Sequence, residues 1–274
     1  MTSEAELVSP GIIALTWFDL AVAASLILVA ALVSLALKLG ITSKIAVAAL
    51  RTTVQLSLVG LILQWVFALE RWYLVLALLS SMIINAGVAG VRRTQRRYGG
   101  IWTHGLFSIT VCGLITTFVV TELVIGVRPW WEPRYIIPLM GMVLGNALTA
   151  LSLTLDRVTN DLEVRRAEVD SWLALGATKW EAARPIVADA IRTGMIPIIN
   201  TMSVAGIVAL PGMMTGQILA GQPPMEAVMY QIVVMFMIAG ACAMAALLSG
   251  LLAFRALTTA RHQVASHLLR KIDG

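Results

Sequence analysis

The sequence predicts an all-α membrane protein, a polytopic bundle of about seven transmembrane helices. Of its 274 residues, 59% are hydrophobic and 13% are charged, whereas a soluble domain is about 45–50% apolar and about 25% charged. The apolar residues fall in runs of about 20, the length that crosses a bilayer as a helix. The basic residues lie between those runs, which is typical of cytoplasmic loops and does not indicate nucleic-acid binding. We therefore interpret residues 1–274 as a single transmembrane domain in contact with membrane lipid.

Seven apolar runs are candidate spans. The N-terminal segment carries Glu4 and Glu6 and no basic residue before the first run, so it lacks the positive region of a signal peptide. The first run is therefore expected to remain in the protein as a span. We expect spans at roughly residues 12–37, 45–69, 72–91, 104–127, 135–155, 190–210 and 226–254.

The distribution of lysine and arginine predicts the orientation of these spans. Four arginines crowd the loop after the third run, at positions 92, 93, 96 and 97. We place this loop in the cytoplasm, where positive residues accumulate. Alternation then puts the N-terminus outside and the C-terminus in the cytoplasm, and only Arg71, Arg128 and Arg134 of the 20 basic residues fall in outer loops.

The segment 156–189 between the fifth and sixth runs is too polar to span, yet its apolar residues recur at nearly helical spacing. We expect a helix, a turn and a second helix. Gly176 would end the first helix, and Thr178 would cap the second. Glu181 completes a capping-box pattern with Thr178, and Pro185 would lie inside the second helix and kink it. On shape alone, such a pair could equally lie on the membrane surface.

A resemblance gives this segment a sharper interpretation. The stretch Asp170-Ser-Trp-Leu-Ala-Leu-Gly176, with Ile186 ten residues later, resembles the cytoplasmic EAA loop of ABC importer permeases, although Trp172 replaces a small residue of that motif. In those permeases the loop forms the coupling helix that docks on the ATPase. The resemblance implies an ATPase-coupling loop formed by Asp170, Leu173, Leu175, Gly176, Thr178, Trp180 and Ile186.

Longer stretches resemble a second group, the iron-export ABC permease family, whose plant relatives are tied to aluminium tolerance. These stretches are Trp172-Leu-Ala-Leu-Gly-Ala-Thr178, Ala182-Ala-Arg-Pro185, Leu210-Pro-Gly-Met-Met-Thr-Gly-Gln-Ile-Leu-Ala-Gly221 and Tyr230-Gln-Ile-Val-Val-Met-Phe-Met-Ile-Ala-Gly240. The resemblance covers nearly the whole chain. It implies a permease in the plasma membrane of a bacterium that exports iron or a related metal ion. A small organic solute stays open as the cargo.

The chain has no phosphate-binding loop with which to use ATP itself. No Gly-x-x-x-x-Gly-Lys-Ser/Thr pattern occurs, and Gly40-Ile-Thr-Ser-Lys44 lacks the second glycine. We therefore expect a permease subunit that is not an enzyme, binds no cofactor directly and uses ATP through a separate ATPase subunit. Seven spans are few for a translocation path, so we also expect a homodimer paired with two ATPase subunits.

Polar side chains within spans are candidates for the transport pathway, because placing them in lipid is costly. Asn and Gln are also common as contacts between helices. Glu122 is expected either to face the pathway or to pair with Arg128. The candidates in the spans are Asp19, Gln55, Asn85, Glu122, Asn146, Asn200 and Gln231.

A further candidate follows the sixth run directly, at residues 211–217. Its proline and two glycines predict that no regular helix forms there, so backbone carbonyls would be free to line a path. Thr215 and Gln217 offer oxygen, and Met213 and Met214 offer sulfur. A tight outer turn is the alternative, and methionine is also a flexible apolar filler. The metal ligands stay unknown, because the histidines at positions 104, 262 and 267 lie in inner loops, at a span end or in the tail.

Other classes of membrane protein fit less well. A serine protease needs a histidine base at the depth of its serine, and a retinal photoreceptor needs a Schiff-base lysine in its last span. No run contains a histidine away from its end, and the last run contains no lysine. Cys112 and Cys242 lie inside apolar runs and are interpreted as packing residues. A receptor and an ATP-independent secondary transporter stay open as alternatives.

Overall fold

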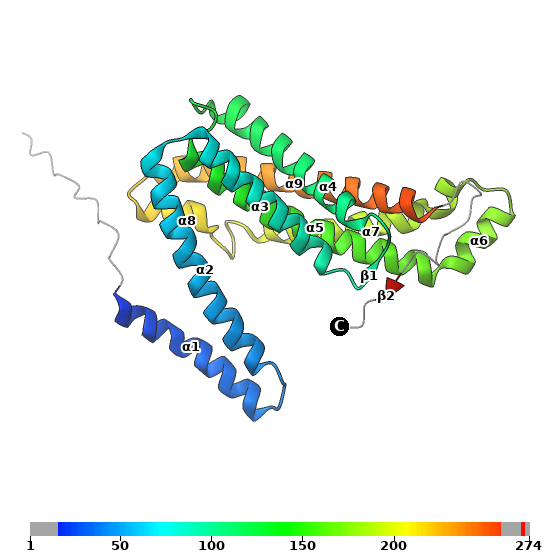
Figure 1. Cartoon of the computed structure of the whole chain (residues 1–274), viewed down its shortest axis with the longest axis horizontal. Helices are drawn as coiled ribbons and strands as arrows, with labels where there is room; N and C mark the ends of the chain where they lie inside the picture. The colour runs from blue at the N-terminus through cyan, green and yellow to red at the C-terminus, as the bar shows by residue number, and fades with distance from the viewer. Residues whose placement is uncertain (1–15, 259–269, 272–274) are drawn as a thin grey trace, which may run out of the picture. The chain divides into compact units, whose positions relative to one another are not determined.

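The computed structural model describes residues 16–258 and 270–271, and over these residues the protein is almost entirely α-helical (Figure 1). The start of the expected first span, at residues 12–15, lies outside them, as do His262 and His267. The helices are α1 (Trp17–Ala36), α2 (Thr42–Leu69), α3 (Trp72–Arg92), α4 (Ile101–Phe118), the π-helix η1 (Val119–Ile125), α5 (Pro133–Val164), α6 (Arg166–Ala174), α7 (Lys179–Val204), α8 (Gly212–Leu219) and α9 (Pro224–Leu257). Two short strands, β1 (Arg96–Arg97) and β2 (Arg270–Lys271), pair antiparallel.

The chain divides into two compact units. The first comprises Met1–Arg71 and Gly216–Pro223, and its described part holds α1, α2 and the C-terminal half of α8. The second comprises Trp72–Thr215 and Pro224–Gly274 and holds the remaining helices.

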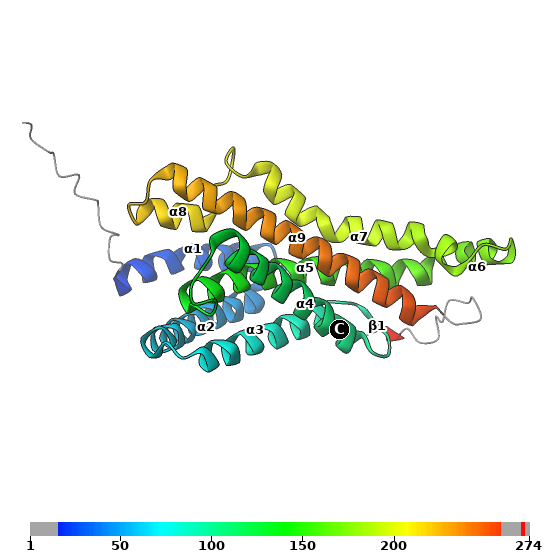
Figure 2. The same ribbon diagram turned by 90° about the horizontal axis from the view of Figure 1, so that it is seen from above.

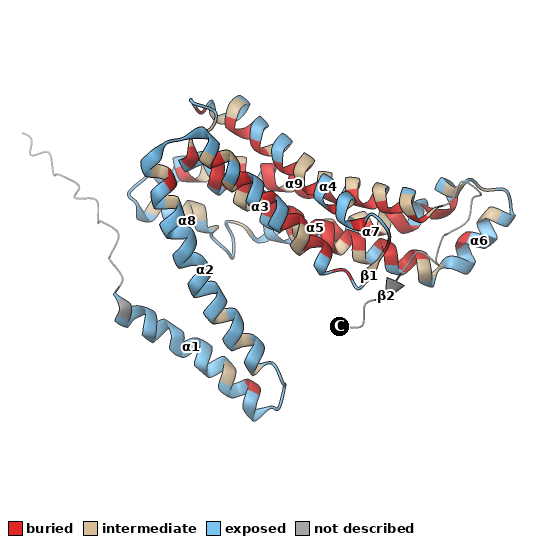
Figure 3. Ribbon diagram, in the orientation of Figure 1, coloured by how far each residue is buried: buried red, intermediate tan, exposed pale blue. Residues whose placement is uncertain are grey.

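The second unit is a bundle built around α5. This helix packs against α3, α4, α7 and α9, and α9 also packs against α4 and α7. In Figure 3 the buried residues form continuous stripes along α5 and α9. Val143, Leu151 and Leu155 of α5 and Ala241 and Ala245 of α9 are completely buried. The core of the unit therefore lies where these two helices meet their neighbours.

Small residues allow α5, α7 and α9 to approach closely, as they do in many membrane bundles. Gly194 of α7 faces α5: a Cβ there would overlap Thr154 Oγ1 and lie 2.8 Å from the carbonyl oxygen of Ala150. Gly250 of α9 faces α7 and α5, where a Cβ would lie 3.3 Å from Ile191 Cγ1. Side chains at these positions would push the three helices apart.

The first unit contains a helical hairpin, α1 and α2, that buries few of its residues. Thr16 caps α1 through a capping box with Asp19, whose Oδ2 accepts from the Thr16 backbone N–H at 2.8 Å. Since α1 begins at Trp17, Asp19 lies in its first turn. Asp19, a pathway candidate of the first span, therefore serves at the start of α1 as a capping residue.

Six helices of the described chain are long and apolar enough to cross a membrane: Phe18–Ala36, Thr42–Leu69, Trp72–Arg92, Ile101–Ile125, Pro133–Val164 and Pro224–Leu257. They correspond to six of the seven expected spans. The other expected span, 190–210, falls partly in α7, which is not among the six. Charged residues at its start, together with Arg192, Pro197 and Asn200, dilute the apolar character of this helix.

The long loop expected at 156–189 is largely helical and continuous with its neighbours. α5 extends to Val164, well past the expected end at 155, and α7 starts at Lys179 and runs on without a break through Asp189. The helices thus run past the expected limits of the apolar spans, because polarity marks where a helix leaves lipid, not where its hydrogen bonds end. In Figure 2, α7 and α9 run side by side, and α6 lies at the end from which α7 starts.

Candidate functional site

The helix pair at the end of α5 forms the first part of the candidate site. As expected, a turn around Gly176 separates α6 from α7, and Gly176 has a φ of +92°, a conformation that favours glycine. Thr178 caps α7: its Oγ1 accepts from the Glu181 N–H at 3.3 Å, and the Thr178 N–H donates to Glu181 Oε2 at 2.8 Å. The hydrogen bonds that the Thr178 N–H and, at 2.7 Å, the Thr178 hydroxyl donate to the Glu181 carboxylate lower the pKa of that group. The predicted capping box is confirmed.

Charged residues brace this helix pair. Arg165, at the break between α5 and α6, donates two hydrogen bonds of 2.8 Å to Glu168, which lower the pKa of that carboxyl. The same guanidinium lies 4.0 Å from Asp189 of α7, which in turn pairs with Arg192 at 2.7 Å. Exposed ion pairs contribute little singly, but a network that joins three helices restrains their relative positions.

Large apolar side chains are exposed around the turn. Trp172 and Trp180 are exposed, and Leu175 is the most open, at 82%. Leu173 is half-buried, and the Trp180 ring contacts that of Phe254 in α9 edge to face, with centroids 5.2 Å apart. We call Trp172, Leu175 and Trp180 the docking tip. An apolar cluster on an otherwise charged protrusion suits a protein–protein contact.

The remaining residues of the predicted coupling loop have other surroundings. Asp170 lies on α6, where its carboxylate is 3.5 Å from Arg166. Ile186 is 1% exposed and packs in the core, so it cannot touch another protein directly. Helix packing explains why an apolar residue stands at this position of the motif. The sequence alone does not show whether an apolar residue packs in the core or docks on a partner.

The second part of the candidate site is a cavity of about 530 Å³ at the opposite end of α7 from the docking tip. With 26 residues, α7 separates the two by about 39 Å. The cavity is lined by Met202, Ala205, Gly206, Leu210, Pro211, Met214, Val228, Gln231, Ile232, Met235 and Phe236. We call it the methionine cavity. Its walls are mainly apolar, as in most binding pockets for small molecules.

The expected irregular segment at 211–217 is instead the short α-helix α8, which begins at Gly212. The prediction failed because Pro211 precedes the helix, where proline is well tolerated, and because a glycine within a helix costs only about 1 kcal/mol. The helical structure is instead interrupted just before α8, between Val204 and Gly212. α7 ends at Val204, Gly206 has a φ of +80°, and the Gly206 N–H donates to the Ala209 carbonyl at 2.9 Å.

Gln231 gives the methionine cavity its polar group. Only 8% of this residue is exposed, and its Oε1 has no hydrogen-bond partner in the described chain. A buried unpaired amide oxygen is costly unless a ligand or water satisfies it. Of the residues predicted to line the pathway, Gln231 and Met214 meet in this cavity.

The other pathway candidates lie elsewhere. Asn85 and Asn146 each donate to a carbonyl of their own helix, Ser81 O at 2.8 Å and Met142 O at 2.9 Å. Gln55 and Asn200 are exposed on α2 and α7. The others lie on α8, with Met213 and Thr215 half-buried and Gln217 in the part of that helix that belongs to the first unit.

Glu122 lies in the π-helix η1 that ends the fourth span. Its Oε2 is 3.1 Å from Arg128 Nη1, the pairing that was one of the two alternatives expected for it. Its Oε1 is buried and has no hydrogen-bond partner among the described residues. A π-helix turns side chains away from their α-helical directions and is frequent at functional sites. Here it places a carboxylate that is almost buried beside an exposed arginine.

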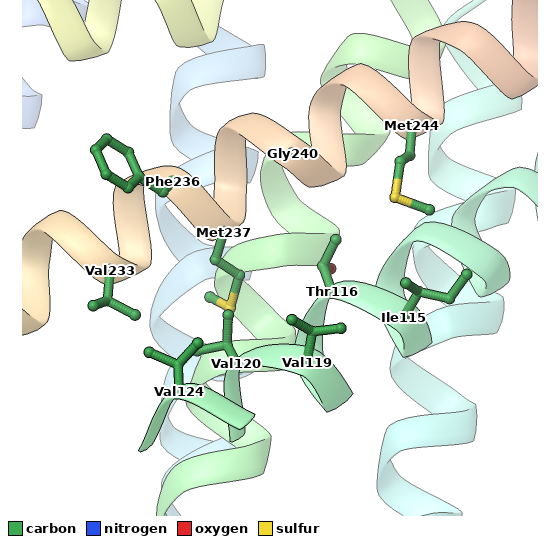
Figure 4. Close-up of a pocket in the computed structure, with 10 residues that line it drawn as sticks. All are labelled: Ile115, Thr116, Val119, Val120, Val124, Val233, Phe236, Met237, Gly240 and Met244. Carbon is green, nitrogen blue, oxygen red and sulfur yellow. The ribbon is translucent and has the colours of Figure 1, made fainter. Parts of the chain in front are cut away.

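A second cavity, of about 420 Å³, lies between α4, η1 and α9 (Figure 4). Met237 and Met244 line it together with valines, Ile115, Thr116, Phe236 and Gly240. We call it the α4–α9 cavity. It offers thioethers without a buried amide, and its walls come from α4, the π-helix η1 and α9.

Sequence reasoning missed Met202, Met235 and Phe254. Met235 follows Gln231 by four residues and therefore shares its helix face, a signal that was available. The sequence contained no such signal for Met202 or Phe254, because the residues beside them belong to other helices. Across the described residues, no group of three or more His, Cys, Asp or Glu side chains could hold a metal ion.

The chain is similar in sequence to known membrane proteins. The chain matches the Uncharacterised protein family (UPF0014) over residues 17–258. It is 31% identical over 253 residues to the Probable iron export permease protein FetB of Escherichia coli, covering 92% of this chain and 96% of that protein. It is 33% identical to the Arabidopsis thaliana Protein ALUMINUM SENSITIVE 3 (90% and 89% covered) and 30% identical to the Bacillus subtilis UPF0014 membrane protein YjkA (87% and 94%). No solved structure matches the chain.

Proposed function

The chain belongs to the UPF0014 family of membrane proteins, and from that premise we propose that it is the membrane-spanning permease subunit of an ABC transporter, driven by a separate ATPase. The docking tip carries this proposal. Its large apolar side chains stand at the end of a braced, capped helix pair, outside the apolar spans. Such a protrusion is what a permease needs in order to receive movement from an ATPase.

The proposed topology has seven spans, with α7 as the sixth in chain order. Its apolar part lies beyond Arg192, and it packs against α5 and α9, two of the six candidate spans. The basic loop at 92–97 supports a cytoplasmic position for the inner ends of the spans. The docking tip and the C-terminus then lie in the cytoplasm and the N-terminus outside.

The proposed cargo is iron or a related metal ion, moved out of the cytoplasm across the plasma membrane. The name of the Escherichia coli relative, Probable iron export permease protein FetB, supports both cargo and direction. The methionine cavity provides a place for cargo within the packed unit. We further propose that two copies of the chain assemble with two ATPase subunits.

The test is co-purification of the tagged chain with its ATPase, comparing Leu175→Asp with Val208→Asp. Both residues are 82% exposed, but they lie beyond opposite ends of α7, so Val208→Asp is a matched control. Burying one leucine stabilises a contact by about 1.5–3 kcal/mol. We therefore expect Leu175→Asp to weaken ATPase binding by about 10- to 100-fold, with little effect of Val208→Asp.

Leu175 is a sharper test than Trp180, because Trp180 also packs on Phe254 and its replacement would disturb the bundle. Two results contradict the proposal. One is that no ATPase accompanies the folded wild-type chain, which would favour a secondary transporter. The other is that Leu175→Asp and Val208→Asp retain the ATPase equally, which would remove the docking tip from the interface.

A further inference from the structure

The lining of the methionine cavity includes three methionines from different elements. Met202 lies near the end of α7, Met214 near the start of α8 and Met235 in α9. These residues are far apart in the sequence, so their convergence is a property of the fold. Thioether sulfur is a soft ligand, preferred by ions such as Cu(I) over Mg²⁺ or Ca²⁺.

Oxygen atoms complete the donor set. Gln231 Oε1 is buried and unpaired. Ala205, Gly206 and Leu210 also line the cavity, and no backbone N–H of the described residues donates to their carbonyls. The break between α7 and α8 is what leaves these carbonyls without helical partners.

All of these donors are neutral, and none of the described residues that line the cavity is charged. A site without an opposite charge, within largely apolar walls, disfavours highly charged ions. The free-energy cost of removing water from such an ion is not offset by an ion pair. The volume is much larger than one bare ion. Methionine, however, has three rotatable side-chain bonds and can close around a small guest. Low charge and softness are therefore the properties that this donor set selects.

We infer that the methionine cavity binds a soft or borderline transition-metal ion of low charge, through Met202, Met214, Met235 and Gln231. This inference rests on the proposed function and narrows its cargo: Fe(II) fits the site better than Fe(III) or Al(III), and monovalent Cu(I) and Ag(I) fit best. The site binds weakly enough for release, because its described lining residues supply no thiolate, imidazole or carboxylate.

The test uses Ag(I) as the probe on the purified full-length chain in chloride-free detergent solution, with bound metal measured after equilibrium dialysis. The test variant carries Met202→Leu, Met214→Leu and Met235→Leu. Leucine keeps the apolar volume and removes the sulfur. The matched control carries Met237→Leu and Met244→Leu in the α4–α9 cavity. The control also accounts for binding to the other thioethers, since the chain has 13 methionines.

We expect the triple variant to lose one bound Ag(I) per chain, with affinity weakened by about 10- to 100-fold or more, and the control to bind as the wild type does. Mg²⁺ should not compete. Gln231→Glu, which adds one negative charge without changing shape, should strengthen Fe(II) binding relative to Ag(I). Unchanged thermal unfolding of each variant shows that the fold is retained.

Equal Ag(I) binding by the wild type and the triple variant would overturn the inference, as would competition by Mg²⁺. Absence of Ag(I) binding together with saturable binding of an apolar organic probe would overturn it in favour of an organic cargo. The assay contains no ATPase. Loss of Ag(I) binding only in the triple variant would therefore support the site even if no ATPase co-purified, and the proposed function would then fail by itself.

Discussion

In two comparisons, a helix of the first unit is as apolar as a helix of the second unit and yet much less buried. The most apolar 18-residue stretches of α1 and α9 have the same mean hydropathy. However, 6% of the stretch in α1 is buried, compared with 44% of the stretch in α9. The same holds for α2 and α5, with 0% and 56% buried. Hydropathy therefore reports that a helix prefers lipid to water, and it does not report whether the helix packs against its own chain.

The difference follows from the physics of a bilayer. Lipid tails are as apolar as leucine, so apolar surface gains nothing by leaving lipid for another helix. Packing in the second unit rests instead on close contact, which requires small residues at the crossings and interhelical hydrogen bonds. The functional parts follow this division, because the methionine cavity and the docking tip both belong to the packed unit.

The largest effect should come from removing a packed leucine. Leu155 of α5 is completely buried, whereas Leu61 of α2 is 63% exposed. Leu155→Ala leaves a cavity and should cost about 2–5 kcal/mol of unfolding free energy. Leu61→Ala should cost less than about 0.5 kcal/mol. Denaturant titration of both variants in detergent measures the difference. Equal losses would mean that α2 is packed as tightly as α5.

A glycine pair should give effects of opposite sign. A Cβ at Gly194 would overlap Thr154 of α5, whereas one at Gly60 of α2 would meet no atom within 4 Å. Gly194→Ala should destabilise the protein by about 1–3 kcal/mol through overpacking. Gly60→Ala should stabilise it by up to about 1 kcal/mol, because alanine is the better helix former.

Thermal unfolding of the two glycine variants, with Gly145→Ala as a control in α5 itself, checks this prediction. Gly145 also has open space around its Cβ position, so its variant should behave like Gly60→Ala. Destabilisation by all three substitutions would show that the loss of glycine is harmful whether or not another helix lies close to it. The stability differences could then not be attributed to helix packing.

The sequence predicted local features well. The capping box of Thr178 and Glu181 joins residues three apart, and the Glu122–Arg128 pair joins residues six apart. The positions of six spans followed from apolar runs because a helix in lipid must be about 20 residues long. In each case the determining interaction lies within one segment or between a segment and lipid.

Features that depend on which helix faces meet were not predictable. The sequence contained Met202, Met214 and Met235, but nothing in it places the end of α7 beside α8 and the start of α9. Ile186 matched a docking motif and is buried in the core. At residues 211–217, α8 formed against the expected break because helix propensity penalties of about 1 kcal/mol per glycine are small enough for context to override.

The smallest predicted effect concerns a hydroxyl that joins two helices. Ser152 Oγ of α5 lies 2.8 Å from the Gly90 carbonyl of α3 and 2.8 Å from the Leu148 carbonyl of its own helix, so it can donate its proton to either. Ser25 Oγ of α1 donates only within its own helix, to Val22 O at 2.6 Å. Interhelical hydrogen bonds in membrane proteins average about 0.6 kcal/mol. Ser152→Ala should therefore lower the unfolding free energy by at most about that amount, and Ser25→Ala should leave it nearly unchanged, since the hydrogen bond that it removes lies within one helix and joins no two helices. Denaturant titration precise to about 0.3 kcal/mol separates the two outcomes. An equal response of both serines would mean that the hydroxyl matters only through helix propensity, and that the shapes of the side chains alone hold α3 against α5.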